Sequence, residues 1–208
     1  MLEYLDNEID SDTCIILLHG FGANKEDLFS LQSLFSQSRV VSYQAPISLA
    51  PQGHFGGYAW FSLDFTPFGI QYDIDEAELA LDMLYKEISI KRKEYSKLLI
   101  CGFSQGCILT HGLLLRYPGL LDGAICLSGR YSEFVFEDAD TKHLKDFPIF
   151  ISHGHYDNVI PIDLGKKIIS FYKASPAELT SKLYDMAHEI SFECQKDVRS
   201  WYASHILI

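Results

Sequence analysis

The stretch KLLICGFSQG, residues 97–106, joins a short apolar run to a G-x-S-x-G pentapeptide. The run Lys97–Cys101 predicts a buried strand, and the helical spacing that begins at Gln105 predicts a helix directly after it. The glycines at the two ends of the pentapeptide let strand and helix approach closely, so that a sharp turn lifts the hydroxyl of Ser104 above the strand end. This context favours a nucleophilic serine over the alternative, an ordinary connection in which Ser104 only caps the helix.

Similar apolar runs recur along the chain and alternate with stretches of helical spacing. Five further runs predict strands that are covered on both faces: Thr13–Leu18, Arg39–Tyr43, Gly123–Leu127, Pro148–Ser152 and Ser181–Tyr184. The intervening stretches predict helices: Lys25–Gln37, Asp75–Glu87, Ser104–Arg116, Ile162–Tyr172 and Glu189–Tyr202. The alternation indicates an α/β fold with a mostly parallel central sheet flanked by helices, in one domain over residues 1–208. We also expect an antiparallel edge strand within Leu2–Ile9.

The segment from Gln44 to Tyr72 interrupts this rhythm, because proline and glycine mix with aromatic residues and neither period is sustained. Connections this long are usually functional or disordered. Its aromatic residues argue against disorder: Phe55, Tyr58, Trp60, Phe61, Phe65 and Phe68. Two interpretations stay open, a wall or lid over a site and a loop with its own aromatic core, and exposed aromatic residues here also suit a dimer face.

Composition limits the classes of protein that fit. The 208 residues include 17 Lys and Arg against 28 Asp and Glu, a formal net charge of -11. Such a field repels phosphate backbones and anionic headgroups, so we expect no nucleic-acid binding and no attachment to anionic membranes. No apolar run approaches the roughly 18 residues that span a bilayer, and the acidic residues after Met1 do not suit a secretory signal. We therefore expect a globular, cytoplasmic protein without integral membrane association.

The cysteines number five, an odd count, and form no CxxC pair: Cys14, Cys101, Cys107, Cys126 and Cys194. This spacing favours neither a disulfide framework nor a zinc site. We expect these side chains to pack as small apolar groups in a reduced protein.

A nucleophilic serine needs a base, and the base needs an orienting partner. Asp157 lies in the loop that follows the strand Pro148–Ser152, and His188 follows the strand Ser181–Tyr184. Sites in open α/β sheets form at these carboxyl ends. The order of serine, acid and histidine along the chain is also the order found in proteins with this kind of nucleophile turn. We therefore predict Asp157 as the acid and His188 as the base.

The competing residues suit these roles less well. Three histidines lie away from any strand end and are expected to be packed or solvated: His111, His143 and His205. His153 and His155 are closely spaced but have no further ligand in a recognised arrangement, so no metal site is predicted. Asp185 would break the expected order, and a turn role suits it better.

An acyl-transfer site also needs donors for the oxyanion that develops during the reaction. The backbone N–H of Gln105, directly after the serine, is one candidate. The loop after Thr13–Leu18 reads His19-Gly20-Phe21-Gly22, and its glycines allow the N–H of Phe21 to turn inward. The alternative interpretation of this loop is a glycine-rich turn with no catalytic role, and the serine motif later in the chain favours the oxyanion role instead.

Four ordered blocks resemble the phospholipase/carboxylesterase family, which includes the acyl-protein thioesterases. They are residues 18–22, 102–106, 153–161 and 187–190. The resemblance implies a compact α/β-hydrolase without a large cap domain and without a cofactor. It also implies nucleophile, acid and base roles for Ser104, Asp157 and His188, and oxyanion roles for Phe21 and Gln105.

The block around Trp60 and Phe61 resembles the family's aromatic block beside the acyl pocket, and we expect Trp60, Phe61 and Val159 to contact substrate. The chain departs from the usual family pattern at three places: Ser62 stands where an aspartate is common, Cys107 where a glycine is common, and Ala187 where a glycine usually precedes the histidine.

The sequence thus predicts a serine carboxylesterase that hydrolyses esters or thioesters with an apolar acyl group through an acyl-enzyme. The alternatives are an acyl-protein thioesterase or lysophospholipase, which would make an acylated protein or a lysophospholipid the partner, and a non-catalytic α/β-hydrolase that binds a ligand. A dehydrogenase is excluded because Gly20-Phe21-Gly22 lacks the further spaced glycine of a dinucleotide loop. The sequence leaves both a monomer and a homodimer open.

Overall fold

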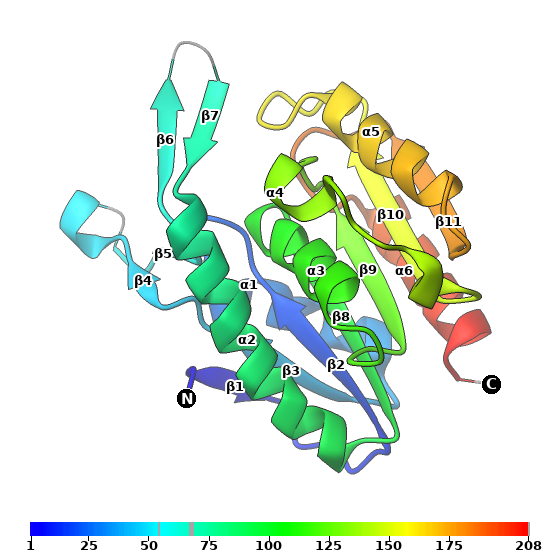
Figure 1. The fold of residues 1–208 in the computed structure, drawn as a ribbon. Helices are drawn as coiled ribbons and strands as arrows, with labels where there is room; N and C mark the ends of the chain where they lie inside the picture. Colours follow the sequence, from blue (N-terminus) through cyan, green and yellow to red (C-terminus); the bar gives the residue numbers. More distant parts are fainter. Residues whose placement is uncertain (54, 67–68, 208) are drawn as a thin grey trace.

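A seven-stranded sheet with the strand order β1-β3-β2-β8-β9-β10-β11 forms the centre of the protein (Figure 1). The computed structural model describes residues 1–53, 55–66 and 69–207. The strands of this sheet are β1 (Tyr4–Asp6), β2 (Thr13–Leu18), β3 (Arg39–Tyr43), β8 (Lys97–Phe103), β9 (Gly123–Leu127), β10 (Pro148–Gly154) and β11 (Glu178–Tyr184). Neighbours pair in parallel except β1, which is antiparallel to β3. The predicted α/β class and the antiparallel edge strand are confirmed.

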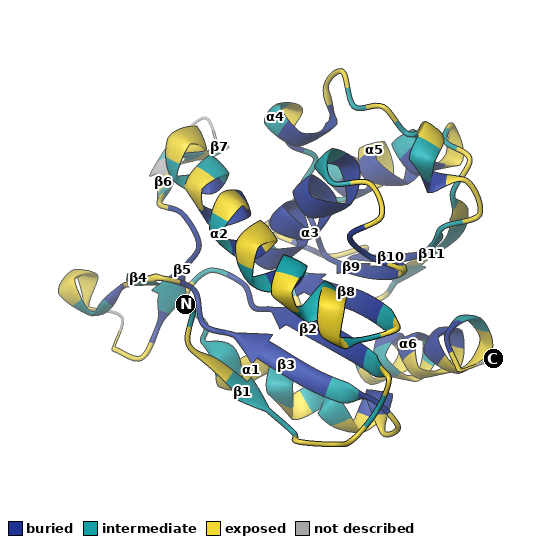
Figure 2. Cartoon of the chain, turned by 60° about the horizontal axis from the view of Figure 1, so that its bottom comes forward, coloured by how far each residue is buried: buried dark blue, intermediate teal, exposed yellow. Residues whose placement is uncertain are grey.

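Helices cover both faces of the sheet. One face carries α2 (Ile74–Glu94), α3 (Gln105–Arg116), α4 (Glu133–Phe136), the short 3-10 turn η3 (Lys142–Leu144) and α5 (Ile162–Lys173). The other carries α1 (Lys25–Phe29), the 3-10 segment η1 (Ser30–Phe35) and α6 (Phe192–His205). The central strands are buried along their length (Figure 2). Burial on both faces explains why these strands read as continuous apolar runs rather than as alternating patterns.

Several helix boundaries differ from the sequence prediction, and α2 extends beyond the predicted Glu87 to Glu94. The helix expected over Lys25–Gln37 is α-helical only to Phe29 and then continues as a 3-10 segment. The hydroxyl of Ser30 donates to the carbonyl of Asp27 at 2.6 Å, a local bond that competes with regular helix geometry. The last helix begins at Phe192 rather than Glu189, because the side chain of Ser191 caps it by accepting from the N–H of Cys194.

The segment Gln44–Tyr72 contains more regular structure than predicted. It forms the pair β4 (Ile47–Ser48) and β5 (Tyr58–Ala59), the short 3-10 turn η2 (Ala50–Gln52), and the hairpin β6 (Leu63–Thr66) and β7 (Gly69–Tyr72). These strands are two to four residues long, too short to establish a period in the sequence. Phe68 lies outside the described residues.

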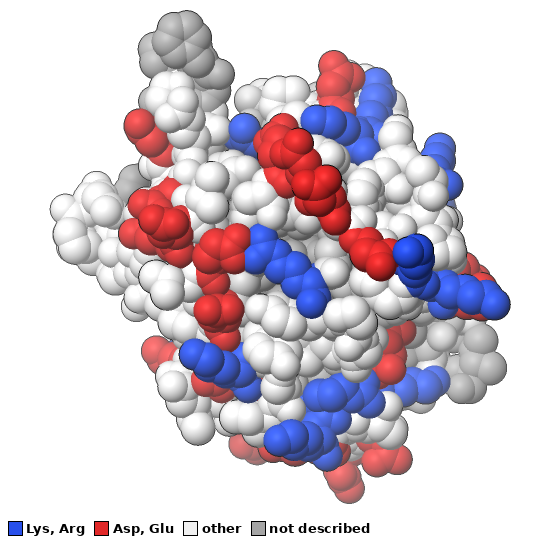
Figure 3. Space-filling view, in the orientation of Figure 1, with Lys and Arg blue, Asp and Glu red and all other residues white. Residues whose placement is uncertain are grey.

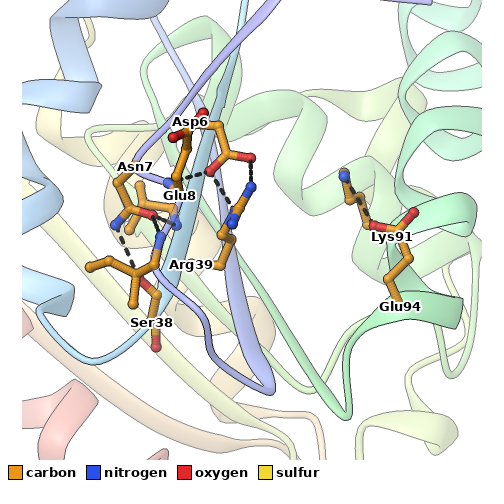
Figure 4. Close-up of polar contacts among 9 residues, drawn as sticks. Asp6, Asn7, Glu8, Ser38, Arg39, Lys91 and Glu94 are labelled. Carbon is orange, nitrogen blue, oxygen red and sulfur yellow. Dashed lines mark hydrogen bonds and ion pairs between the residues drawn. The ribbon is translucent and has the colours of Figure 1, made fainter.

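Polar contacts hold the edge strand β1 in place (Figure 4). The guanidinium of Arg39 pairs with the carboxylate of Asp6, with Nη2 and Oδ2 2.7 Å apart. Asn7 donates from Nδ2 to the carbonyl of Ser38 at 3.1 Å and accepts from the N–H of Val40 at 3.0 Å. These bonds fix the register of β1 against β3 although the pairing covers only three residues.

All five cysteines are free and buried, as predicted. Within the described ranges, no helix has both the length and the apolar character needed to cross a bilayer.

Candidate active site

The predicted site residues gather where the strand order reverses. From β2 the chain passes to β3 on one side and later to β8 on the other, so a crevice opens at the carboxyl ends of β2 and β8. Leu18, the last residue of β2, pairs with Gly102 of β8, which brings the loop containing Phe21 beside the turn containing Ser104. Topology therefore places these two loops together although more than 80 residues separate them in the sequence.

Ser104 occupies a backbone conformation that side-chain-bearing residues rarely adopt, with φ 53° and ψ -112°. A Cβ at Gly102 would lie 2.5 Å from the carbonyl oxygen of Gly106, and a Cβ at Gly106 would lie 2.1 Å from that of Leu18. Glycine is thus required at both positions for the strand and α3 to approach. The N–H of Ser104 donates to the carbonyl of Leu127 at 3.0 Å, which holds the turn against β9.

Hydrogen bonds connect Ser104, His188 and Asp157 in that order. The Nε2 of His188 lies 2.9 Å from the Oγ of Ser104, and its Nδ1 lies 2.7 Å from the Oδ2 of Asp157. An ionised carboxylate only accepts, so Nδ1 carries the proton and Nε2 of the neutral ring is left to accept from the serine hydroxyl. The tautomer that a general base needs therefore follows from the position of Asp157.

The loop after β10 holds Asp157 in place. Its Oδ1 accepts from the N–H groups of Val159 at 2.9 Å and Ile160 at 2.8 Å. Burial alone would raise the pKa of Asp157, but the bonds from His188 and from these two N–H groups outweigh burial and hold the pKa below its usual 3.8. The carboxylate thus stays ionised near neutral pH.

The two loops that carry Asp157 and His188 are also joined by their backbones. The N–H of His155 donates to the carbonyl of Tyr184 at 2.7 Å, and the N–H of Tyr156 donates to that of Met186 at 3.1 Å. Parallel pairing of β10 with β11 therefore continues into both loops and sets the distance between Asp157 and His188.

Gln105 begins α3, where the first N–H groups lack partners inside the helix. Its side chain has a separate role that the sequence prediction missed. The Oε1 accepts from the N–H of Trp60 at 2.9 Å, and the Nε2 donates to the carbonyl of Phe61 at 2.7 Å. Gln105 thereby ties the segment after β5 to the start of α3. Phe21 lines the same cavity as Ser104 and Gln105.

His19 is a second residue whose role the prediction missed. Its Nδ1 donates to the carbonyl of Gly20 at 2.8 Å, and its Nε2 accepts from the N–H of Ala45 at 3.1 Å. Its own carbonyl accepts from Trp60 Nε1 at 2.9 Å. Burial lowers the pKa of His19 to about 4, so the ring is neutral at pH 7. These bonds hold the loop that leads to Phe21, and the only sequence signal for them was the position of His19 at the strand end.

A cavity of about 350 Å³ opens at Ser104 and His188. Its wall is largely apolar, and its lining residues are Phe21, Leu63, Ile70, Tyr72, Ser104, Gln105, Ile108, Arg130, Val159, Ile160 and His188. Leu63, Ile70 and Tyr72 come from the β6–β7 hairpin, so part of the unusual segment forms a wall of the cavity. This matches the first of the two interpretations of that segment.

The three residues expected to contact substrate are placed differently from one another. Val159 lines the cavity and is 44% exposed. Trp60 and Phe61 are fully buried and do not belong to the cavity wall. Aromatic side chains favour burial, and the bonds of Trp60 to His19 and Gln105 support the loops beneath the cavity instead of its surface.

Among the described residues, His153, His155 and His111 lie outside this hydrogen-bonded series or at its edge. His153 is buried, with Nε2 2.8 Å from the carbonyl of Ile160 and 3.4 Å from Oδ2 of Asp157, and His155 is exposed. His111 forms a buried group with Cys107 and Cys126, in which the possible metal-ligand atoms lie within 4.8 Å of one another. Sulfur and ring nitrogen are 3.5 Å apart for Cys107 and 3.7 Å apart for Cys126.

Known proteins that are similar to this chain include carboxylesterases and an acyl-protein thioesterase. The model of the Phospholipase/Carboxylesterase family matches residues 6–206. Carboxylesterase SOBER1 of Arabidopsis thaliana is 28% identical over 204 residues, which cover 91% of this chain and 89% of the relative. Acyl-protein thioesterase 1 of Kluyveromyces lactis is 26% identical over 201 residues, which cover 88% of each chain.

Among solved structures, the Bacillus cereus carboxylesterase aligns with a TM-score of 0.84 at 19% identity, over 99% of this chain and 95% of that one, and shows a shared fold. The crystal structure of Arabidopsis thaliana SOBER1 aligns with a TM-score of 0.77 at 26% identity, over 93% of this chain and 99% of that one. Because the family model spans nearly the whole chain, the predicted resemblance is confirmed: the protein belongs to the phospholipase/carboxylesterase family.

Proposed function

We propose that this protein is a serine carboxylesterase that cleaves carboxylic esters or thioesters with an apolar acyl group. The observation that carries this proposal is the pair of hydrogen bonds that join Ser104, His188 and Asp157 beside a largely apolar cavity, which opens at Ser104. Relatives named carboxylesterase and acyl-protein thioesterase support the same reaction class.

The reaction follows from the positions of the hydrogen bonds. The Oγ of Ser104 attacks the acyl carbonyl while Nε2 of His188 takes its proton. Asp157 accepts from Nδ1 and stabilises the imidazolium that forms, and the N–H groups of Phe21 and Gln105 are assigned to the oxyanion. His188 then protonates the leaving alcohol or thiol. Water attacks the acyl-enzyme with His188 again as base, which releases the acid and restores Ser104.

Labelling with a fluorophosphonate probe tests this proposal, because the probe reacts with an activated serine. We expect labelling of the wild type and loss of labelling in Ser104→Ala, with kcat on p-nitrophenyl esters lowered by about 10⁶-fold. Ser33→Ala, at an exposed serine, is the matched control and should behave as the wild type. Turnover by Ser104→Ala close to that of the wild type would overturn the assignment.

The acyl-chain profile separates the candidate substrates. Rates on p-nitrophenyl esters of increasing length, compared with rates on palmitoylated peptides and lysophospholipids, distinguish a carboxylesterase from an acyl-protein thioesterase or lysophospholipase. An apolar wall favours longer acyl groups over acetate until the cavity is filled.

A further inference from the structure

One charged side chain in the cavity wall takes no part in the proposed reaction. Arg130 lies three residues beyond β9 and is the one lysine or arginine among the described residues that line the cavity. The same wall also contains Leu63, Ile70 and Ile108. A guanidinium in such surroundings has an unusual position for a group that prefers water or a carboxylate partner.

The hydrogen-bonding capacity of Arg130 is largely unused. Its Nη1 donates to the carbonyl of Ile70 at 2.5 Å, and the guanidinium lies 5.5 Å from the centre of the Tyr72 ring. Its Nε is buried without a hydrogen-bond partner. A guanidinium has five N–H donors, and the second donor on Nη1 and the two on Nη2 have no hydrogen-bond partner among the described residues, so these three remain for a bound group.

Three other arginines show what a paired guanidinium looks like in this chain. Each has a carboxylate partner, and the pairs are Arg39 with Asp6, Arg92 with Asp122 and Arg116 with Glu78. Across the described ranges, Arg130 has no carboxylate within 4.0 Å. The positive charge in the cavity is therefore not neutralised by the protein itself.

The rest of the molecule is predominantly acidic, in contrast to the positive charge of Arg130 in the cavity wall. The chain has a net charge of -11, and acidic side chains gather around the start of α2, whose first turn contains Asp75 and Glu76 (Figure 3). An isolated cation beside apolar walls interacts with an anion more strongly than the same cation in water, because the local dielectric constant is lower.

We propose that Arg130 binds a carboxylate of the substrate, so that the preferred substrates are esters or thioesters carrying an anionic carboxylate in addition to the bond that is cleaved. The inference rests on the proposed function and narrows its substrate class. A planar guanidinium matches a carboxylate with two parallel hydrogen bonds, and the apolar lining accommodates the chain between the carboxylate and the reacting carbonyl. The carboxylate belongs either to the acyl part or to the leaving group.

Two pairs of matched substrates test the inference and separate these sources. The acyl pair is the p-nitrophenyl monoester of adipic acid against p-nitrophenyl hexanoate. The leaving-group pair is the hexanoyl ester of glycolic acid against ethyl hexanoate. In each pair a terminal carboxylate replaces a methyl group, and the readout is the ratio of kcat/KM for the charged and neutral substrates.

For one of the two pairs, we expect Arg130→Gln to lower this ratio by about 10- to 100-fold, the effect of losing a charged hydrogen-bonding partner. Arg130→Lys should retain part of the preference, because lysine keeps the charge but not the planar fork. Arg199→Gln is the matched control, since it makes the same change in charge at an exposed arginine outside the cavity wall. Its ratio should stay at the wild-type value.

The alternative is that Arg130 only holds the β6–β7 hairpin through its bond to Ile70. Arg130→Gln would then change kcat/KM of the charged and neutral substrates by the same factor in both pairs, and the inference would be overturned. Labelling by the fluorophosphonate probe shows that each variant is folded, and Arg130→Lys gives a second ratio if Arg130→Gln is not. Absence of Ser104-dependent turnover of the neutral substrates contradicts the proposed function instead.

Discussion

Replacing Gln105 with leucine separates the role of its side chain from that of its backbone N–H. The side chain joins two fully buried residues by accepting from the N–H of Trp60 and donating to the carbonyl of Phe61. Leucine has a similar volume, so it leaves no space for a water molecule to replace the amide. The N–H of Trp60 and the carbonyl of Phe61 then lose their hydrogen bonds to the side chain of residue 105.

An unsatisfied buried donor or acceptor costs about 1–3 kcal/mol, so the two groups together cost about 4 kcal/mol. The added apolar burial of leucine offsets about 1 kcal/mol of this loss. We therefore expect the free energy of unfolding to fall by about 3 kcal/mol and Tm by about 6–12 °C for a chain of this length. The backbone N–H assigned to the oxyanion is unchanged, so the folded variant should still be labelled by the fluorophosphonate probe.

Urea unfolding at pH 7 and 25 °C measures the change, with Gln37→Leu at an exposed glutamine as the matched control. The control should change stability by less than about 0.5 kcal/mol. A loss below about 1 kcal/mol in Gln105→Leu would refute the reasoning, because it would mean that the bonds to Trp60 and Phe61 contribute little.

Two further predictions concern the groups that hold the site. Asp157→Asn should lower kcat by about 10⁴-fold, because an amide can donate to Nδ1 and favour the wrong tautomer of His188. The control Asp185→Asn, at an exposed position, should leave kcat unchanged. Equal kcat values for the two variants in steady-state kinetics would contradict the assignment of Asp157. The pKa of His19 is lowered from 6.5 to about 4, so its contribution to stability is complete above pH 6.5 and is lost as pH falls from 6.5 to about 4. The difference in unfolding free energy between wild type and His19→Gln should therefore shrink by about 3 kcal/mol between pH 7 and pH 4, and a constant difference in urea titrations would show that His19 is not buried in its neutral form.

Local sequence patterns were sufficient to locate the central strands of the sheet, because a strand buried on both faces appears in the sequence as a continuous apolar run. Thr13–Leu18, Arg39–Tyr43 and Gly123–Leu127 match the observed strands at both ends. Helix ends were less predictable, because they depend on single side-chain bonds. Ser191 caps α6 and Ser30 disturbs α1, and a serine at either position has several equally local alternatives.

The proximity of Ser104, Asp157 and His188 was predictable because each follows a recognisable strand, and parallel strands bring their carboxyl ends to one edge. The distances between their atoms were not. They depend on the register of β10 with β11 and on the backbone bonds that continue it into both loops. Register is a property of the paired strands, and a strand that is apolar on both faces carries little information about it.

The sequence by itself determined the α/β class, the family and the residues expected to react, because these depend on periodicity and on motifs contained in short segments. Only the folded chain decided which side chains form the cavity. Trp60 and Phe61 have the composition of a pocket wall but lie in the core, while Arg130, which no motif singles out, faces the cavity. The depth of a side chain depends on segments far apart in the chain, and here the bond from Arg130 to Ile70 joins the β6–β7 hairpin to the segment that follows β9.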